Sequence, residues 1–261
     1  MPLADLTVTL IQTELCWENP AENRRILSQK IAEIASPTDL IVLPEMFTTG
    51  FSMQTEKLAE KMTGPTVKWL LEMAKLKNAA ICGSIIIEEE NRYYNRLLWA
   101  QPDGQLFTYD KRHLFRMAHE NGSFSAGKSK LIVHWRGWNI CPLVCYDLRF
   151  PVFSRWTKQA SYDLLLYVAN WPEKRAAAWK TLLPARAIEN LSYCLGVNRV
   201  GKDENGILYS GDSVICDPQG ATFFLPSHTE AVHTQILSAA ALESFRQRFP
   251  AFEDADAFEL L

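Results

Sequence analysis

The sequence lacks the features that would direct a chain to a membrane or to a nucleic acid. None of its apolar stretches approaches the roughly 20 residues that a membrane-spanning helix needs. The start, M-P-L-A-D-L-T, has no basic region of the kind that opens a signal peptide. The formal net charge of −3 favours neither nucleic acid nor an anionic lipid surface as a partner. We therefore expect a cytoplasmic protein that binds neither.

Cysteine is scarce for a chain of this length. Six cysteines in 261 residues do not reach the density of a disulfide scaffold, so the thiols are expected to be reduced. Cys141 and Cys145 form a C-x-x-x-C pair, but no second pair of cysteines or histidines follows at the spacing of metal ligands. We predict neither a metal site nor another cofactor.

Nothing in the chain marks a domain boundary. There is no low-complexity tract, no Gly/Ser linker and no internal repeat of about 20 to 50 residues. Residues 1–261 are therefore predicted to form a single domain.

The apolar spacing predicts an alternation of helices and short strands. Helix-like stretches lie at 20–35, 66–77, 153–159 and 175–190. Strand-like runs lie at 6–12, 40–43, 80–88, 96–100, 106–109, 131–135, 140–144, 164–169, 194–198, 212–216 and 222–225. The turn sequences P-D-G at 102–104 and D-P-Q-G at 217–220 predict hairpins. This order favours an α/β fold with mixed rather than purely parallel sheets.

Four of the predicted strands deliver a polar group at their carboxyl end. The strands at 40–43, 106–109, 140–144 and 164–169 run into Glu45, Lys111, Cys145 and Asn170. Ligands of layered α/β proteins bind at the carboxyl ends of strands, so these side chains could share one pocket. A thiol needs a base to become a nucleophile, and a buried carboxylate can serve. A nearby ammonium favours the thiolate and later an oxyanion.

The same residues carry a resemblance to a known family. L-P-E-M-F at 43–47, Y-D-K-R-H-L-F at 109–115 and V-C-Y-D-L-R-F-P at 144–151 resemble, in order and spacing, motifs of the carbon–nitrogen hydrolase (nitrilase) superfamily. A-R-A-I-E-N at 185–190 is similar to the helix that follows the nucleophile in that superfamily. The likeness covers nearly the whole chain, and D-K-R-H-L-F with C-Y-D-L-R-F looks most like the omega-amidase branch.

The resemblance implies a fold and a set of roles. The implied fold is a four-layer α-β-β-α sandwich of two mixed sheets flanked by helices, with protomers paired as a homodimer. Glu45 is implied as the general base, Lys111 as the cation that meets the oxyanion, and Cys145 as the nucleophile that forms a thioester. Glu120 matches a second glutamate that orients the lysine and the substrate.

The implied substrate is a small dicarboxylic acid that carries one terminal amide, such as 2-oxoglutaramate or 2-oxosuccinamate, hydrolysed to the diacid and ammonia. Aromatic side chains at Phe47, Phe115 and Trp171 are expected to line its apolar body, with Tyr146 beside the nucleophile. A distal carboxylate needs a cation. The candidates are Arg112, Arg116, Arg149, Lys174 and Arg175, and the preference goes to Arg175, which follows the 164–169 strand.

Other interpretations stay open at the level of the sequence. The chain could be a broad aliphatic amidase of the same superfamily, or a catalytically inactive binding module, although none of the three implied catalytic residues is replaced. It could also pass the acyl group to an amine rather than to water. His113 and His119 could pair with Cys145, or they could simply pack in the wall of the pocket.

Overall fold

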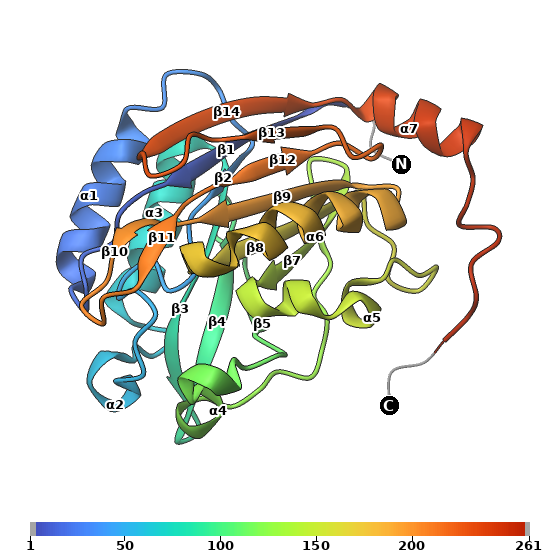
Figure 1. Ribbon diagram of the computed structural model, residues 1–261. Helices are drawn as coiled ribbons and strands as arrows, with labels where there is room; N and C mark the ends of the chain where they lie inside the picture. The colour runs from blue at the N-terminus through green and yellow to red at the C-terminus, as the bar shows by residue number, and fades with distance from the viewer. Residues whose placement is uncertain (1–3, 259–261) are drawn as a thin grey trace.

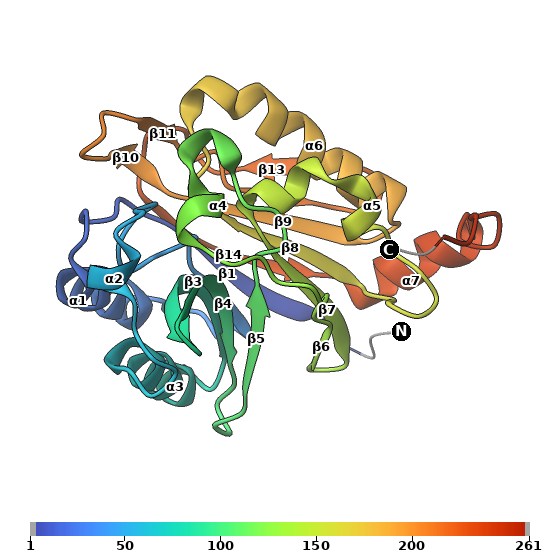
Figure 2. The same ribbon diagram turned by 90° about the horizontal axis from the view of Figure 1, so that it is seen from below.

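The structure, a computed structural model that describes residues 4–258, is built on two six-stranded mixed sheets (Figure 1, Figure 2). The first sheet has the order β14-β1-β2-β3-β4-β5. Its strands are β1 (Leu6–Gln12), β2 (Leu40–Val42), β3 (Ala80–Glu89), β4 (Arg92–Ala100), β5 (Leu106–Asp110) and β14 (Ala231–Leu237).

The second sheet has the order β13-β12-β9-β8-β7-β6, and a separate two-stranded hairpin stands beside it. Its strands are β6 (Val133–Trp135), β7 (Trp138–Val144), β8 (Leu164–Ala169), β9 (Tyr193–Asn198), β12 (Val214–Cys216) and β13 (Thr222–Phe224). The hairpin pairs β10 (Val200–Lys202) with β11 (Leu208–Ser210).

Helices cover the outer face of each sheet. Helix α1 (Pro20–Ala32) and helix α3 (Pro65–Lys77) lie together over the first sheet, and helix α6 (Ala176–Glu189) lies over the second (Figure 2). The shorter helices are α2 (Thr55–Leu58), α4 (Glu120–Ser123), α5 (Pro151–Ser154) and, near the C-terminus, α7 (Ala239–Arg248). The four-layer α-β-β-α sandwich is therefore confirmed.

The side chains of β2 alternate between the core that lies between the two sheets and the core that lies beneath the helices. Leu40 and Val42 point into the core between the sheets, whereas Ile41 belongs to the core beneath the helices, where it joins Leu27 of α1 and Leu70 of α3. Successive side chains of a strand face opposite sides, so a strand covered on both faces must be apolar throughout. This explains the continuous apolar runs at the centres of both sheets.

The two sheets repeat one pattern of strand directions. From β14 to β5 the pairings are antiparallel, parallel, parallel, antiparallel and antiparallel, and the same series runs from β6 to β13. Both sheets thus have a parallel centre. Because β5 is antiparallel to β4 and β4 to β3, β5 ends at the same edge as the central strands. The end of β5 therefore leads the chain to the edge where β2 ends.

The predicted elements match the structure with one wrong assignment. The stretch at 153–159 is not a helix: α5 ends at Ser154, and Arg155 has an extended ψ of 132°. The Trp156 N–H donates to the Asn190 side chain at 2.8 Å, and the Arg155 carbonyl accepts from Lys130. These groups are therefore not available for helical hydrogen bonds.

The elements that were not predicted are the short helices α2 and α4, the β10–β11 hairpin, β14 and α7, together with one strand extension. Strand β14 is a largely polar edge strand, and α7 follows it directly after the Ser238 N-cap. Strand β4 also begins four residues earlier than expected, at Arg92, and this extension contains Asn95. Both turn sequences do form hairpins, between β4 and β5 and between β12 and β13. Within residues 4–258, the structure contains no helix with the length and apolar character needed to span a membrane.

The contact between α6 and β9 predicts a glycine requirement. A Cβ atom on Gly196 would lie 2.5 Å from Leu183 Cδ1 and 2.7 Å from Trp179 Cζ2. We expect Gly196→Ala to lower the free energy of unfolding by about 1–3 kcal/mol through overpacking, as measured by chemical denaturation. Gly122→Ala is the matched control, because no heavy atom lies within 4 Å of its added Cβ. Equal stability of Gly196→Ala and the wild type would show that the helix can move away from the sheet.

Candidate active site

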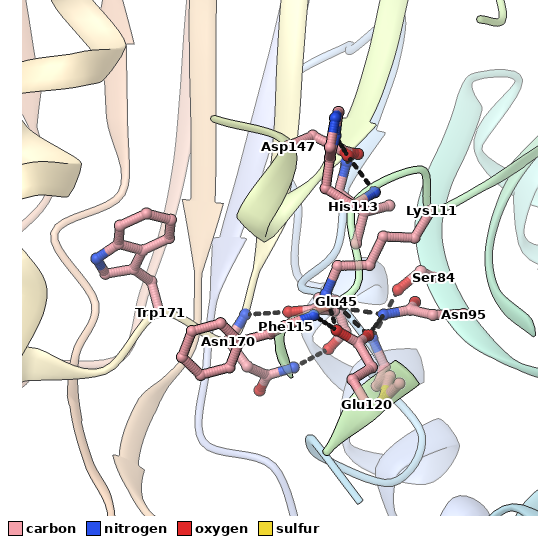
Figure 3. A network of polar contacts seen from close by, with 12 residues as sticks. Glu45, Ser84, Asn95, Lys111, His113, Phe115, Glu120, Asp147, Asn170 and Trp171 are labelled. Carbon is pink, nitrogen blue, oxygen red and sulfur yellow. Dashed lines mark hydrogen bonds and ion pairs between the residues drawn. The ribbon is translucent and has the colours of Figure 1, made fainter. Parts of the chain in front are cut away.

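Glu45 lies at the centre of a buried polar network where β2 ends (Figure 3). Its side chain has no exposed surface. Oε1 accepts from Lys111 Nζ at 2.9 Å and from Asn95 Nδ2 at 2.8 Å, and Oε2 accepts from the Asn170 N–H at 2.7 Å. The Asn170 side chain also donates to the Glu45 carbonyl at 2.6 Å. The Glu45 carboxylate, which follows β2, thus contacts residues from the ends of β5 and β8 and from β4.

Lys111 is shared between two buried carboxylates. Its Nζ lies 2.9 Å from Glu120 Oε1 and 3.0 Å from Glu120 Oε2, in addition to the contact with Glu45. Burial disfavours the charged ammonium, but the charges of Glu120 and Glu45 outweigh burial and raise the pKa of Lys111. The lysine is therefore a permanent cation at neutral pH.

Glu120 is the first residue of α4 and is fully buried. Burial and the negative charge of Glu45 raise its pKa, whereas Lys111 and the Phe115 N–H, which donates to Oε2 at 2.5 Å, lower it. Glu120 does not line the cavity described below. It acts on that cavity only through Lys111 and the loop that carries Phe115.

Cys145 begins a tight turn directly after β7 and has a φ of 43°. That left-handed conformation is unusual for a residue other than glycine. The Cys145 side chain lies at the carboxyl end of β7. Burial and the charge of Glu45 raise the pKa of the thiol well above its usual value, although Lys111 opposes the rise. The resting thiol is therefore protonated and needs a base before it can act as a nucleophile.

Asp147 holds this turn against the loop of Lys111. Its carboxylate is fully buried and accepts from the Tyr109 hydroxyl at 2.7 Å, from the Val144 N–H at 3.0 Å and from the His113 N–H at 3.0 Å. The His113 ring also contacts it, with Nδ1 2.7 Å from Oδ1. His113 therefore joins the two loops through Asp147, whereas His119 is exposed and is the N-cap residue that precedes α4. Asp147 was not identified from the sequence as part of the site.

A cavity of about 500 Å³ lies beside Cys145. Its walls include four of the five predicted binding residues, Phe115, Tyr146, Trp171 and Arg175, together with Arg149 and Lys174. Phe51 and, from the segment around β11, Ile207 and Tyr209 also line it and were not predicted. Because the β10–β11 hairpin was not predicted, Ile207 and Tyr209 could not be identified as lining residues from the sequence.

Phe47 is a correction to the predicted pocket. Its side chain is fully buried in the core beneath the helices, with its ring 5.8 Å from that of Trp69, and it does not line the cavity. The chain turns after Glu45, where Met46 has a φ of 42°, so that residue 47 faces the helices rather than the sheet interface. Of the predicted cations, Arg112 and Arg116 also lie outside the cavity lining.

Arg149 and Arg175 are both placed to meet an anion. The Arg149 guanidinium lies 5.2 Å from the centre of the Trp171 ring, and the Arg175 guanidinium lies 5.2 Å from that of Phe115. Neither is ion-paired with a carboxylate of residues 4–258. Two oriented guanidinium groups thus border the same cavity as the thiol.

The fold and the site define a class: double-sheet α/β sandwiches in which a cysteine, a lysine and two glutamates converge at the carboxyl ends of the strands. The chain belongs to the carbon–nitrogen hydrolase family, whose model matches residues 6–247.

Three similar proteins support this membership. The chain is 47% identical over 258 residues to the omega-amidase YafV of Escherichia coli strain K12, with 98% of each chain covered. It is 30% identical over 251 residues to the 2-oxoglutaramate amidase of Bacillus subtilis strain 168, covering 95% of this chain and 96% of that one. The crystal structure of XC1258 from Xanthomonas campestris, a CN-hydrolase superfamily protein with an arsenic adduct in its active site, superposes with a TM-score of 0.96 at 48% identity. The match covers 99% of this chain and 100% of the other.

The Asp147 contacts predict a stability effect. Asp147→Asn replaces one carboxylate oxygen with an NH₂ group. The N–H or O–H donors that now bond to that oxygen would then face another donor. We expect the free energy of unfolding to fall by about 1–3 kcal/mol, measured by chemical denaturation.

The matched control for this substitution is Asp217→Asn. Asp217 lies in a partly exposed turn and accepts from the N–H groups of Gln219 and Ala221, bonds that an asparagine oxygen can also accept. Its effect should remain within about 0.5 kcal/mol. Equal losses in the two variants would contradict a special role for the buried carboxylate.

Proposed function

We propose that the protein is an omega-amidase that hydrolyses the terminal amide of a small dicarboxylic acid monoamide, such as 2-oxoglutaramate or 2-oxosuccinamate, to the acid and ammonia. The observation that carries the proposal is the cavity itself, which joins Cys145 and Lys111 at one end to unpaired guanidinium groups elsewhere in its wall. The relatives named omega-amidase and 2-oxoglutaramate amidase cover nearly the whole chain.

In this proposal each catalytic residue has one role. Glu45 takes the proton of Cys145, and the sulfur attacks the amide carbonyl. Lys111 and the backbone N–H of Tyr146 meet the developing oxyanion. Glu45 then protonates the departing ammonia and activates water against the thioester. Glu120 acts as the fourth member by holding Lys111 in place.

The distal carboxylate is assigned to the guanidinium groups of the cavity. Arg175 is the preferred anchor from the sequence, and Arg149 is an equal candidate in the structure, because each is oriented over an aromatic ring. A planar guanidinium can bind a carboxylate through two hydrogen bonds. Phe115, Tyr146 and Trp171 supply apolar walls suited to a short carbon chain.

The alternative activities fit the cavity less well. A broad aliphatic amidase would have no use for cationic side chains away from the thiol, yet three line the wall in addition to Lys111: Arg149, Lys174 and Arg175. An inactive binding module would not need a thiol in a strained turn beside a buried carboxylate and lysine. Transfer of the acyl group to an amine remains chemically possible at any thioester, and water is the simpler acceptor.

Further parts of the proposal concern the whole chain. We propose that residues 1–261 form one carbon–nitrogen hydrolase domain that works in the cytoplasm as a homodimer paired through its outer helices. Exposed apolar side chains support such pairing: Val152 on α5 is 53% exposed and Ile188 on α6 is 51% exposed. The catalytic reaction needs no metal, because lysine supplies the positive charge.

Substitution of the thiol and its base separates chemistry from folding. Cys145→Ala should abolish ammonia release while leaving the melting temperature nearly unchanged. Glu45→Gln should slow both turnover and the alkylation of Cys145 by iodoacetamide, because it removes the base that forms the thiolate. Lys111→Ala should lower kcat by about 10²-fold or more, as the loss of an oxyanion donor does. Wild-type activity in Cys145→Ala would overturn the proposed function.

Two near-isosteric amides test the substrate class. Succinamate carries a terminal carboxylate where butyramide carries a methyl group, so a site built around the anion should prefer succinamate by at least roughly tenfold in kcat/KM. Arg175→Gln and Arg149→Gln should each reduce that preference if they bind the carboxylate. Arg116→Gln, outside the cavity lining, is the control. A preference for butyramide would favour the broad amidase and leave the catalytic residues in place.

A further inference from the structure

All four carboxylate oxygens of Glu45 and Glu120 already accept hydrogen bonds. Lys111 and Asn95 each donate to Oε1 of both glutamates, with Asn95 Nδ2 at 2.8 Å from Glu45 and 3.3 Å from Glu120. Oε2 of Glu45 accepts from the Asn170 N–H, and Oε2 of Glu120 accepts from Lys111 and the Phe115 N–H. No oxygen of either carboxylate is without a donor, which favours the ionised form of both.

Asn95 is the neutral group that bridges the two carboxylates. It lies on β4, its residue is only 1% exposed, and its carbonyl accepts from the Lys111 N–H at 3.0 Å (Figure 3). It does not line the cavity, so it cannot touch a substrate there. Any effect of Asn95 on the reaction must therefore pass through Glu45, Glu120 or Lys111.

The orientation of the Asn95 amide is fixed by its neighbours. Its Oδ1 is buried without a hydrogen-bond partner, and Asn170 Oδ1 has the same defect. Turning the Asn95 amide over would point Oδ1 at two carboxylates, which is repulsive. Both buried amides thus leave an acceptor unsatisfied while their donors are used around Glu45. A buried Oδ1 atom without a hydrogen bond lowers stability. We take this cost as a sign that the NH₂ donors of Asn95 and Asn170 serve the site.

The need for the Asn95 donor arises from competition for one proton. Burial and the charge of Glu45 raise the pKa of Glu120, so Glu120 is a competing acceptor for any proton that reaches the network. Neither carboxylate lines the cavity, and protonation of either at rest would remove part of the charge that balances Lys111. Donors on Oε1 of both glutamates oppose such protonation.

We propose that Asn95 is a positioning residue that keeps Glu45 and Glu120 ionised at rest, so that Glu45 is free to take the proton of Cys145. In this step the S–H bond breaks, the proton moves to the Glu45 carboxylate, the sulfur electron pair forms the new C–S bond, and the carbonyl π pair moves to the oxygen. The same proton later passes to the leaving nitrogen. The inference rests on the proposed function.

The pH dependence of catalysis tests the role of Asn95. Asn95→Ser and Asn95→Thr shorten the side chain and remove the bridging NH₂ group. Loss of a donor raises the pKa of a carboxylate, so the acid limb of kcat/KM should move upward by about one pH unit. The activity loss should be large at low pH and recover toward the wild-type rate at high pH. KM at high pH should not change, because Asn95 does not touch the cavity.

Asn190→Ser controls for the loss of a buried asparagine elsewhere. Asn190 is fully buried, donates to the Arg186 carbonyl at 2.9 Å and accepts from the Trp156 N–H. It should lower the melting temperature without moving the pH profile. All variants are assayed below their melting transitions, so reduced stability does not prevent the comparison.

Two outcomes separate the failure of this inference from that of the proposed function. A uniform loss of rate at every pH in both Asn95 variants, with an unmoved acid limb, would reduce Asn95 to a structural residue. The pH dependence of Cys145 alkylation by iodoacetamide should show the same upward shift, and it needs no amide substrate. That shift would uphold the role of Asn95 even if succinamate were not preferred, whereas activity in Cys145→Ala would remove the proposed function itself.

Discussion

The site depends on one buried ammonium that two buried carboxylates share. None of these three groups could be charged alone in the interior, because removal from water is strongly unfavourable for an unpaired ion. Lys111 makes both Glu45 and Glu120 tolerable as anions, and they in turn keep it protonated. Each of the three charged groups therefore needs the other two. The Asn95 side chain and the N–H groups of Asn170 and Phe115 donate hydrogen bonds to the remaining carboxylate lone pairs.

The sandwich brings these groups together because both sheets have a parallel centre. Parallel strands end at one edge, so β2 delivers Glu45, β7 delivers Cys145 and β8 delivers Asn170 toward the same space. Antiparallel pairing through β4 returns β5 to that edge with Lys111. Glu45, Lys111, Cys145 and Asn170 thus follow directly after or within three residues of strands that are packed in the core, and only Glu120 comes from the longer connection between β5 and β6.

Strand ends could be predicted from the sequence, whereas directions within loops could not. An apolar run followed by a polar residue marks a strand end. Sequence analysis could therefore predict that four such residues meet, namely Glu45, Lys111, Cys145 and Asn170. Phe47 was misplaced because a positive φ at Met46 redirects the chain, and a motif does not show that turn. Strand β14 was missed because a polar edge strand has no apolar alternation, and Asn95 because its strand was predicted to begin after it. Asp147 had no signal beyond its charge, since its partners Tyr109 and His113 come from another part of the chain.

The shared lysine leaves the reactive end of the cavity with one uncompensated negative charge, since two carboxylates surround a single ammonium. In an amide hydrolase this excess gives the cavity a direction. Under the proposed function, a neutral amide would approach Cys145, while the carboxylate at the other end of the same molecule would turn toward Arg149 and Arg175. Hydrolysis would then create a second carboxylate where the amide was, close to the two buried carboxylates. The product would be held less well there than the amide it replaces, which would favour its release.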